Sequence, residues 1–246
     1  MGLPLRSQII SRPEPLLPLF PLDLVLLPQT NLPLHIFEER YKEMIGDCLA
    51  NGWEFGMLAA RSQGIEAIGC TASISKVLDR FPDGRMNILV RGRMRFEVSQ
   101  FNREKSYLRA MPAFLDDDSA VPAPAERERA MSLYRRLTDV AELENEPFQD
   151  QTFSSTDTQL SYRMMSGVPA ELSWKQDLLE LRSERERLAR VIDYFEKLLK
   201  QIEPPTVPRK IARVIWRQSK TYRSLDRAIR ESNRYAGLDF DVIPVS

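Results

Sequence analysis

Hydrophobic and polar residues alternate along residues 86–98 of the chain. A period of two predicts a β-strand with one buried and one solvated face. Gly92 falls midway along the apolar face, where the missing side chain permits a bend or a bulge. The apolar face consists of Met86, Ile88, Val90, Gly92, Met94, Phe96 and Val98, and the polar face carries Arg91, Arg93 and Arg95.

Residues 68–78 alternate in the same manner, and a turn of sequence FPDGR separates them from this strand. Because Asp-Gly suits the positive φ of a tight turn, the two runs are predicted to form a hairpin. Shorter runs begin at Trp53 and Tyr107, and short strands around a long bent hairpin favour a small closed or half-closed barrel. One helix interrupts the strands and ends near Asn51-Gly52, with apolar residues at helical spacing: Phe37, Tyr41, Met44, Ile45 and Cys48.

The hydrophobic period changes to 3.6 after residues 116–125, an acidic stretch rich in Pro and Ala. We interpret this stretch as a linker and as a domain boundary. Helices are predicted over 126–143 and 157–166, the second of which ends at a glycine. Residues 126–203 are therefore expected to form an α-helical bundle that follows the barrel, which gives an α+β fold.

Two further helix starts are marked by capping boxes, in which a Ser is followed three residues later by Gln or Glu. Ser173 with Gln176 forms one such pair, and Ser183 with Glu186 forms the other. After the second pair, apolar residues recur at helical spacing from Leu188 to Ile202 and stop at two prolines. This stripe predicts one long amphipathic helix.

The two ends of the chain are expected to lie outside the barrel and the bundle. Residues 1–15 form an N-terminal arm, and residues 204–246 form a basic amphipathic helix and tail. The tail carries nine basic and four acidic residues, whereas residues 116–203 carry twelve basic and nineteen acidic ones. The tail could therefore dock on the acidic part of its own chain, bind a partner, or mediate self-association through residues 208–236.

Composition indicates an ordinary globular protein, with 43% hydrophobic and 28% charged residues and no net charge. Two cysteines, Cys48 and Cys70, without a CxxC motif form neither a disulfide framework nor a zinc site. The amino terminus lacks the apolar core of a secretory signal, and the most apolar early stretch is too short to span a bilayer. We expect a cytoplasmic protein with no membrane association.

The familiar catalytic motifs are missing from the sequence. There is no phosphate-binding loop, nucleophile elbow or dinucleotide fingerprint, and we expect no catalytic residues, no cofactor and no metal. His35 is the only histidine and lies near Glu38 and Glu39. We interpret it as an imidazole that bonds to backbone where a strand turns into a helix, and the two acids as residues that suit the positive end of the helix dipole.

Five ordered blocks of the sequence resemble a known family: LPLFPLDLVLLP, LPLHIFEERYKEMI, IGCTASISKV, DGRMNILVRGRMRFEV and WKQDLLEL followed by ERERL. Together they resemble the N-terminal, substrate-binding domain of Lon proteases across about residues 15 to 200. The resemblance implies a PUA-like pseudo β-barrel over 16–115 and a helical bundle over 126–203. One departure is Pro28-Gln29, where the family usually has Pro-Gly.

The ATPase and Ser–Lys peptidase modules of Lon proteases are absent from these 246 residues. The chain resembles a free-standing substrate-binding domain, which implies a protein without peptidase activity. The motif around the single histidine then becomes a family scaffold motif, made of Pro33, His35, Phe37, Glu38, Arg40 and Tyr41.

The resemblance implies a non-catalytic module that binds exposed segments of other proteins, or a specific protein partner, with a role in protein quality control. Candidate contacts are Arg91, Arg93 and Arg95 on the solvated strand face and the ring of Tyr107. The alternative for the arginines is a plain solvated face that pairs with acids such as Asp79 or Glu97.

Two other functions remain open at this point. RNA could bind to the barrel and to the basic tail, where aromatic residues among arginines could stack on bases. The chain as a whole is not basic, with a pI of about 6.7, so nucleic acid is the less favoured partner. An enzyme with an unrecognised site is the third alternative, because a fold by itself does not exclude chemistry.

Overall fold

The computed structural model describes residues 16–61, 64–141, 154–166 and 168–202. The predicted arm over 1–15, the tail over 204–246 and the self-association segment over 208–236 lie outside these residues. The strands are β1 Leu17–Leu22, β2 Asn31–Ile36, β3 Phe55–Arg61, β4 Gly64–Ile65, β5 Ile68–Arg80, β6 Met86–Asn102 and β7 Arg109–Phe114. The helices are α1 Glu39–Asn51, α2 Pro124–Ala141, α3 Leu160–Met164, α4 Leu172–Glu180 and α5 Glu184–Ile202.

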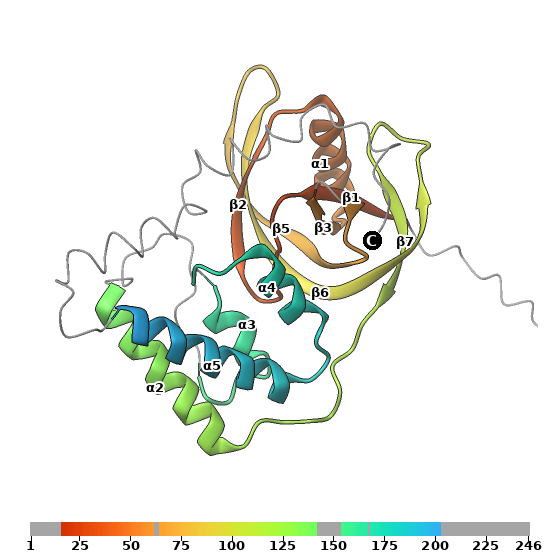
Figure 1. Ribbon diagram of the computed structural model, residues 1–246. Helices are drawn as coiled ribbons and strands as arrows, with labels where there is room; N and C mark the ends of the chain where they lie inside the picture. Colours follow the sequence, from red (N-terminus) through yellow and green to blue (C-terminus); the bar gives the residue numbers. More distant parts are fainter. Residues whose placement is uncertain (1–15, 62–63, 142–153, 167, 203–246) are drawn as a thin grey trace, which may run out of the picture.

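The strands form one mostly antiparallel sheet in the order β1-β7-β6-β5-β3-β4, and β2 pairs with β6. A parallel pairing between β1 and β3 closes a ring through β7, β6 and β5. Figure 1 shows this curved sheet around α1, with α2–α5 gathered on one side of it. The α+β fold with strands first and helices afterwards is therefore confirmed.

The predicted hairpin forms between β5 and β6. Its turn contains Gly84 with φ of 83°, a left-handed conformation that favours glycine after Asp83. Gly92 lies against the loop before β2, where an added Cβ would meet the Leu27 carbonyl oxygen at 2.2 Å. The N–H of Gly92 donates to the Thr30 carbonyl oxygen at 2.9 Å. Gly92 is thus needed for the close approach of this loop.

A β-bulge directly after Gly92 changes the two faces of β6. In the register, Gly92 pairs with Ala72 and Arg95 pairs with Cys70, so two residues of β6 lie opposite the single Thr71. An extra residue shifts the alternation by one position, which exchanges the faces of everything beyond it. The expectation that Met94 belongs to the buried face is therefore wrong, because its side chain is 48% exposed.

Two apolar clusters lie on opposite faces of the strands. The larger one runs without a break from α1 and the barrel strands into α2–α5. The smaller one contains the alternate residues of the same strands and includes Phe96, which lies beyond the bulge. The predicted linker over 116–125 therefore connects two parts that share one core; the division into domains stays a prediction.

The helices largely follow the predicted pattern, with differences at their ends: the helix predicted over 157–166 is the short α3, Leu160–Met164. Pro124 opens α2, a position that suits proline because its missing N–H is not needed there. The Ser183 hydroxyl accepts the N–H of Glu186 at 3.3 Å at the start of α5, as predicted. Ser173 lies inside α4, which begins at Leu172, so that predicted cap is wrong. Within the described ranges, no helix is long and apolar enough to cross a membrane.

Candidate functional site

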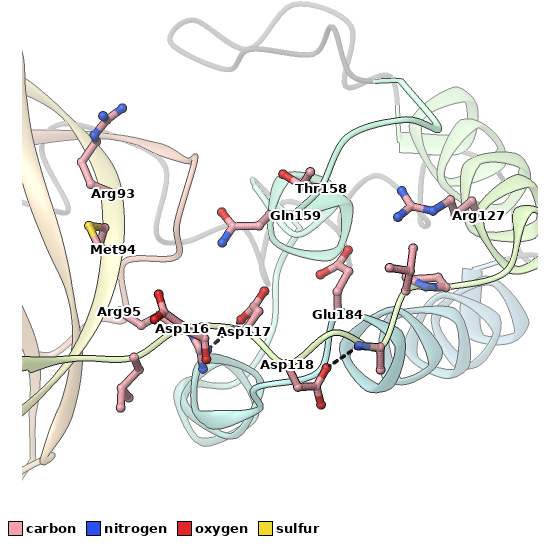
Figure 2. Close-up of a pocket in the computed structure, with 14 residues that line it drawn as sticks. Arg93, Met94, Arg95, Asp116, Asp117, Asp118, Arg127, Thr158, Gln159 and Glu184 are labelled. Carbon is pink, nitrogen blue, oxygen red and sulfur yellow. Dashed lines mark hydrogen bonds and ion pairs between the residues drawn. The ribbon is translucent and has the colours of Figure 1, made fainter.

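A cleft of about 380 Å³ lies where β6 meets the helical part of the molecule. Figure 2 shows side chains of the strand on one side and of the helical part on the other, with Asp116–Asp118 between them. Half of the lining comes from the segment between β7 and α2, which we call the aspartate strap (residues 115–122). The lining residues are Arg93, Met94, Arg95, Leu115, Asp116, Asp117, Asp118, Ala120, Val121, Pro122, Arg127, Thr158, Gln159 and Glu184.

Arg95 forms part of the floor of this cleft, and its predicted place on a solvated face is wrong. The bulge turns its side chain to the face that carries the larger core, where it is 2% exposed. Its Nη1 donates to the carbonyl oxygens of Leu179 (3.0 Å) and Leu181 (2.8 Å) at the carboxyl end of α4. A cation favours this end of a helix, where carbonyl groups lack partners. Arg95 therefore stabilises the end of a helix that is 84 residues away in sequence.

Asp117 of the strap joins Arg95 to a second buried arginine, Arg187 of α5. Its Oδ1 accepts from Arg95 Nη2 at 2.7 Å and from Arg187 Nη1 at 2.9 Å. Arg187 is fully buried, lies over the Tyr162 ring at 4.4 Å, and also contacts Glu184 at 2.9 Å. Two guanidinium groups and two carboxylates thus neutralise one another at the junction of barrel and helices.

The burial of Arg187 by itself would lower the pKa of its guanidinium. The hydrogen bonds that Arg187 donates to Asp117 and the negative charges around the guanidinium outweigh this effect and raise the pKa of Arg187 above its ordinary value. The group is therefore charged at neutral pH, and its carboxylate partners are needed to offset the cost of burying it.

Exposed apolar side chains lie in the same cleft as these buried charges. Met94 is 48% exposed and Val121 is 69% exposed. Thr158 and Gln159 face them from the helical part, where Arg127 Nη1 donates to the Asp157 carbonyl oxygen at 2.7 Å. The cleft thus offers apolar surface together with hydroxyl and amide groups that can donate and accept hydrogen bonds.

The other two candidate arginines lie on the side of β6 that was expected. Arg91 is half-buried and donates to the Gln29 side chain at 3.0 Å. Arg93 is 49% exposed and lies 3.6 Å from Glu54. The predicted partner Asp79 instead accepts from Asn87 at 2.7 Å. Of the three arginines, Arg93 and Arg95 line the cleft and Arg91 does not.

Tyr107, the fourth candidate contact, is buried and lies away from the cleft. Its ring is 2% exposed, and its hydroxyl donates to Asp47 of α1 at 2.6 Å. Burial of the hydroxyl and its bond to the carboxylate raise the pKa of Tyr107 to about 12. The ring therefore secures α1 to the sheet, and the expectation of an exposed contact is wrong.

His35 has a side-chain partner rather than the backbone partner that we expected. Its Nδ1 is 2.7 Å from Asn87 Oδ1, which places His35 at the start of a chain of polar contacts that continues to Asp79. Its ring stacks on Phe37 at 5.9 Å. Phe37 precedes α1 and is only half-buried, so the prediction that it begins the apolar face of that helix is wrong.

The rest of the motif packs as a corner between β2 and α1. Pro33 and Leu34 lie in β2, where they pair with β6. Tyr41 is buried in the larger core, and Arg40 lies over its ring at 4.6 Å while it pairs with Glu38 at 2.7 Å. Burial is the main cause that raises the pKa of Tyr41.

Within the described ranges, no group of three or more His, Cys, Asp or Glu side chains is placed to hold a metal ion. Cys48 and Cys70 are free thiols in the core. Burial raises the pKa of Cys48 to about 12, so this thiol is protonated at neutral pH.

Sequence reasoning missed the strap and Arg187. Asp, Pro and Ala are typical of a linker, so the composition of the strap does not indicate its buried contacts. The sequence does contain an indication that Arg187 is buried, because Val191 and Phe195 follow it at four-residue steps on the buried side of α5. A charge at that spacing indicates a buried ion pair or cluster.

Most of the sequence is similar to that of known proteins. A model of the ATP-dependent protease La (LON) substrate-binding domain matches residues 16–197. The Lon protease of Buchnera aphidicola subsp. Baizongia pistaciae is 26% identical over 209 residues, which cover 78% of this chain and 26% of that protein. The Lon protease of Parabacteroides distasonis is 24% identical over 221 residues, which cover 84% of this chain and 27% of that protein. The chain thus spans about a quarter of the length of these relatives.

Solved structures show the same fold. A Lon N-terminal domain protein from Xanthomonas campestris aligns with a TM-score of 0.57 and 24% identity, over 73% of this chain and 98% of that one. The N-terminal domain of the Mycobacterium avium complex Lon protease aligns with a TM-score of 0.57 and 16% identity, over 74% of this chain and 98% of that one. The resemblance found in the sequence is confirmed, and so is the fold class.

Proposed function

Because this chain belongs to the family of Lon substrate-binding domains, we propose that it is a non-catalytic recognition module for other proteins. It binds exposed, extended segments of its partners in the cleft between β6 and the helices. We place it in the cytoplasm, where Cys48 and Cys70 stay reduced, and assign it a role in protein quality control.

The observation that carries this proposal is the combination of exposed apolar groups and polar hydrogen-bonding groups in one cleft. Met94 and Val121 are exposed there, and a methionine side chain adapts to apolar groups of different shapes. An extended segment could place one apolar side chain against them while its backbone bonds to Thr158 and Gln159.

The charges of the cleft favour a polypeptide over a nucleic acid. The buried arginines Arg95 and Arg187 are already matched by Asp117 and Glu184. Two further carboxylates, Asp116 and Asp118, line the same cleft and would repel phosphate groups. Nucleic acids bind to surfaces with clustered, unmatched Lys and Arg side chains.

Fluorescence anisotropy with two labelled probes tests this function. One probe is an extended peptide rich in Leu and Phe, and the other is a single-stranded RNA of similar length. We expect the peptide to bind at low salt and to remain bound when salt is raised, because apolar contacts are not screened. Binding of the RNA that falls steeply with salt would contradict the proposal.

If neither probe binds, the recognition of extended segments is wrong, and a specific folded partner becomes the function to test. A pull-down with the full chain and with the variant Met94→Asp then separates capture through the cleft from capture elsewhere.

A further inference from the structure

The aspartate strap is attached to three different parts of the molecule by three arginines. Arg95 of β6 donates to the Asp116 carbonyl oxygen at 3.3 Å and to Asp117. Arg182, between α4 and α5, donates to the same carbonyl oxygen at 3.0 Å. Arg187 of α5 contacts the Asp117 carboxylate with both of its terminal nitrogens. The strap therefore ties the barrel to the helical part at one point.

Asp117 is the carboxylate that both buried guanidinium groups share. Arg187 has a second carboxylate partner in Glu184, whereas the ion pair of Arg95 is with Asp117. Both arginines are almost fully buried, so neither can replace a lost partner with water. Within the described residues, loss of the Asp117 charge thus leaves Arg95 without an ion-pair partner and leaves Glu184 as the carboxylate that pairs with Arg187.

The same contacts define the walls of the cleft. Arg95 and Met94 are neighbours on β6, and Val121 follows Asp117 on the strap. Movement of the strap away from Arg95 would therefore change the distance between the two exposed apolar groups. Another direct polar contact between the sheet and α2–α5 is the bond from the Gln176 side chain to the Ile68 carbonyl oxygen at 3.1 Å.

We propose that Asp117 is a charge clamp that fixes the angle between barrel and helical part and so sets the width of the binding cleft. The clamp couples the two parts: a ligand held against Met94 and Val121 is bound tightly only while Asp117 bridges Arg95 and Arg187. The link to ligand binding rests on the proposed function, but the link to the angle does not.

Distance measurements between two spin labels test the clamp without any ligand. The labels are attached at Lys76→Cys on β5 and Ala189→Cys on α5, which are exposed, whereas Cys48 and Cys70 are buried. Asp117→Asn keeps the shape of the side chain and removes its charge. Asp118→Asn is the matched control, because this carboxylate accepts the Ala120 N–H at 2.9 Å and makes no ion pair within the described residues.

We expect Asp117→Asn to broaden or shift the distance distribution and Asp118→Asn to leave it as in the unchanged chain. In parallel, affinity for the Leu- and Phe-rich peptide should fall about tenfold in Asp117→Asn, a change of about 1.4 kcal/mol. An unchanged distribution in Asp117→Asn overturns the clamp. A changed distribution without a change in peptide affinity supports the clamp and overturns the placement of the binding function in this cleft.

A second variant covers the case in which Asp117→Asn does not fold. Asp117→Asn combined with Arg95→Met removes both charges of one pair and leaves Arg187 matched by Glu184. Replacement of a whole buried ion pair is tolerated better than the loss of one partner. This double variant should fold and show the broadened distribution; the unchanged distribution would again overturn the clamp.

Discussion

The two halves of β6 differ in how well the hydrophobic pattern describes them. From Met86 to Gly92, every second residue lies on the buried face, as the pattern predicts. After Gly92 the pattern continues in the sequence, but Met94 is exposed and Arg95 is buried. The two halves differ by one extra residue at the bulge opposite Thr71. One residue is enough to move a charge from solvent into the core.

The three arginines of β6 show the consequence of this difference. Arg91, Arg93 and Arg95 occupy equivalent positions in the sequence pattern. In the structure, Arg91 forms a side-chain hydrogen bond and Arg93 forms a long ion pair at the surface. Arg95 is buried and connects the sheet to the helices. Sequence position within an alternating run therefore does not tell which arginine holds the molecule together.

The largest expected effect on stability distinguishes Arg95 from Arg93. Arg95→Met should lower the free energy of unfolding by about 3–5 kcal/mol, because within the described residues it leaves Arg187 as the one cation for both Asp117 and Glu184 and removes a donor from the end of α4. Arg93→Met is the control and should change it by no more than about 0.5 kcal/mol, as for other exposed residues. Urea denaturation measures both. Equal effects would contradict the account of the bulge.

A smaller effect is expected for the glycine between the two halves. Gly92→Ala places a Cβ against the Leu27 backbone and should cost about 1–3 kcal/mol, as overpacking does. Gly46→Ala is the control, because an added Cβ in the exposed part of α1 meets nothing within 4 Å. It should stabilise the protein by about 1 kcal/mol through helix propensity. Thermal denaturation of both variants tests whether the loop contact at Gly92 is required.

The bulge itself depends on Thr71. Its hydroxyl accepts the N–H of Met94 at 3.1 Å and donates to Glu54 at 2.6 Å. Thr71→Val removes both bonds and should lower the free energy of unfolding by about 1–2 kcal/mol, since it removes the acceptor of the part-buried Met94 N–H. Amide exchange at Met94 should become faster. Ser75→Ala, which removes an exposed hydroxyl of the same strand, should leave that exchange rate unchanged.

The smallest effect on stability concerns Tyr107, which lies just after β6. This effect depends on pH. Hydrogen bonds from Lys105 and Tyr107 lower the pKa of Asp47, so its contribution to stability is present above the ordinary carboxyl pKa and is lost as pH falls through the folded-state value. Tyr107→Phe should cost about 1 kcal/mol at neutral pH. The difference from the unchanged chain should shrink in acid; a difference that grows in acid would contradict the assigned bond.

Much of the fold could be predicted because its signals are local. The Asp-Gly turn, the alternation before Gly92 and the Ser183 cap each depend on a few neighbouring residues. The cleft depends on contacts between distant segments, such as Arg95 with Leu179 and Asp117 with Arg187. Nothing in the local pattern distinguishes an aspartate that clamps two arginines from one in a solvated linker, and this is why the strap was missed.

Peptide binding by two charge-introducing variants tests the central claim most directly. Met94→Asp places a carboxylate on the exposed wall of the cleft, and Phe81→Asp places one on the β5–β6 turn, where Phe81 is 37% exposed. With the Leu- and Phe-rich peptide, we expect Met94→Asp to weaken binding at least about tenfold and Phe81→Asp to leave it unchanged. Equal binding by both variants would contradict a recognition site in the cleft between β6 and the helices.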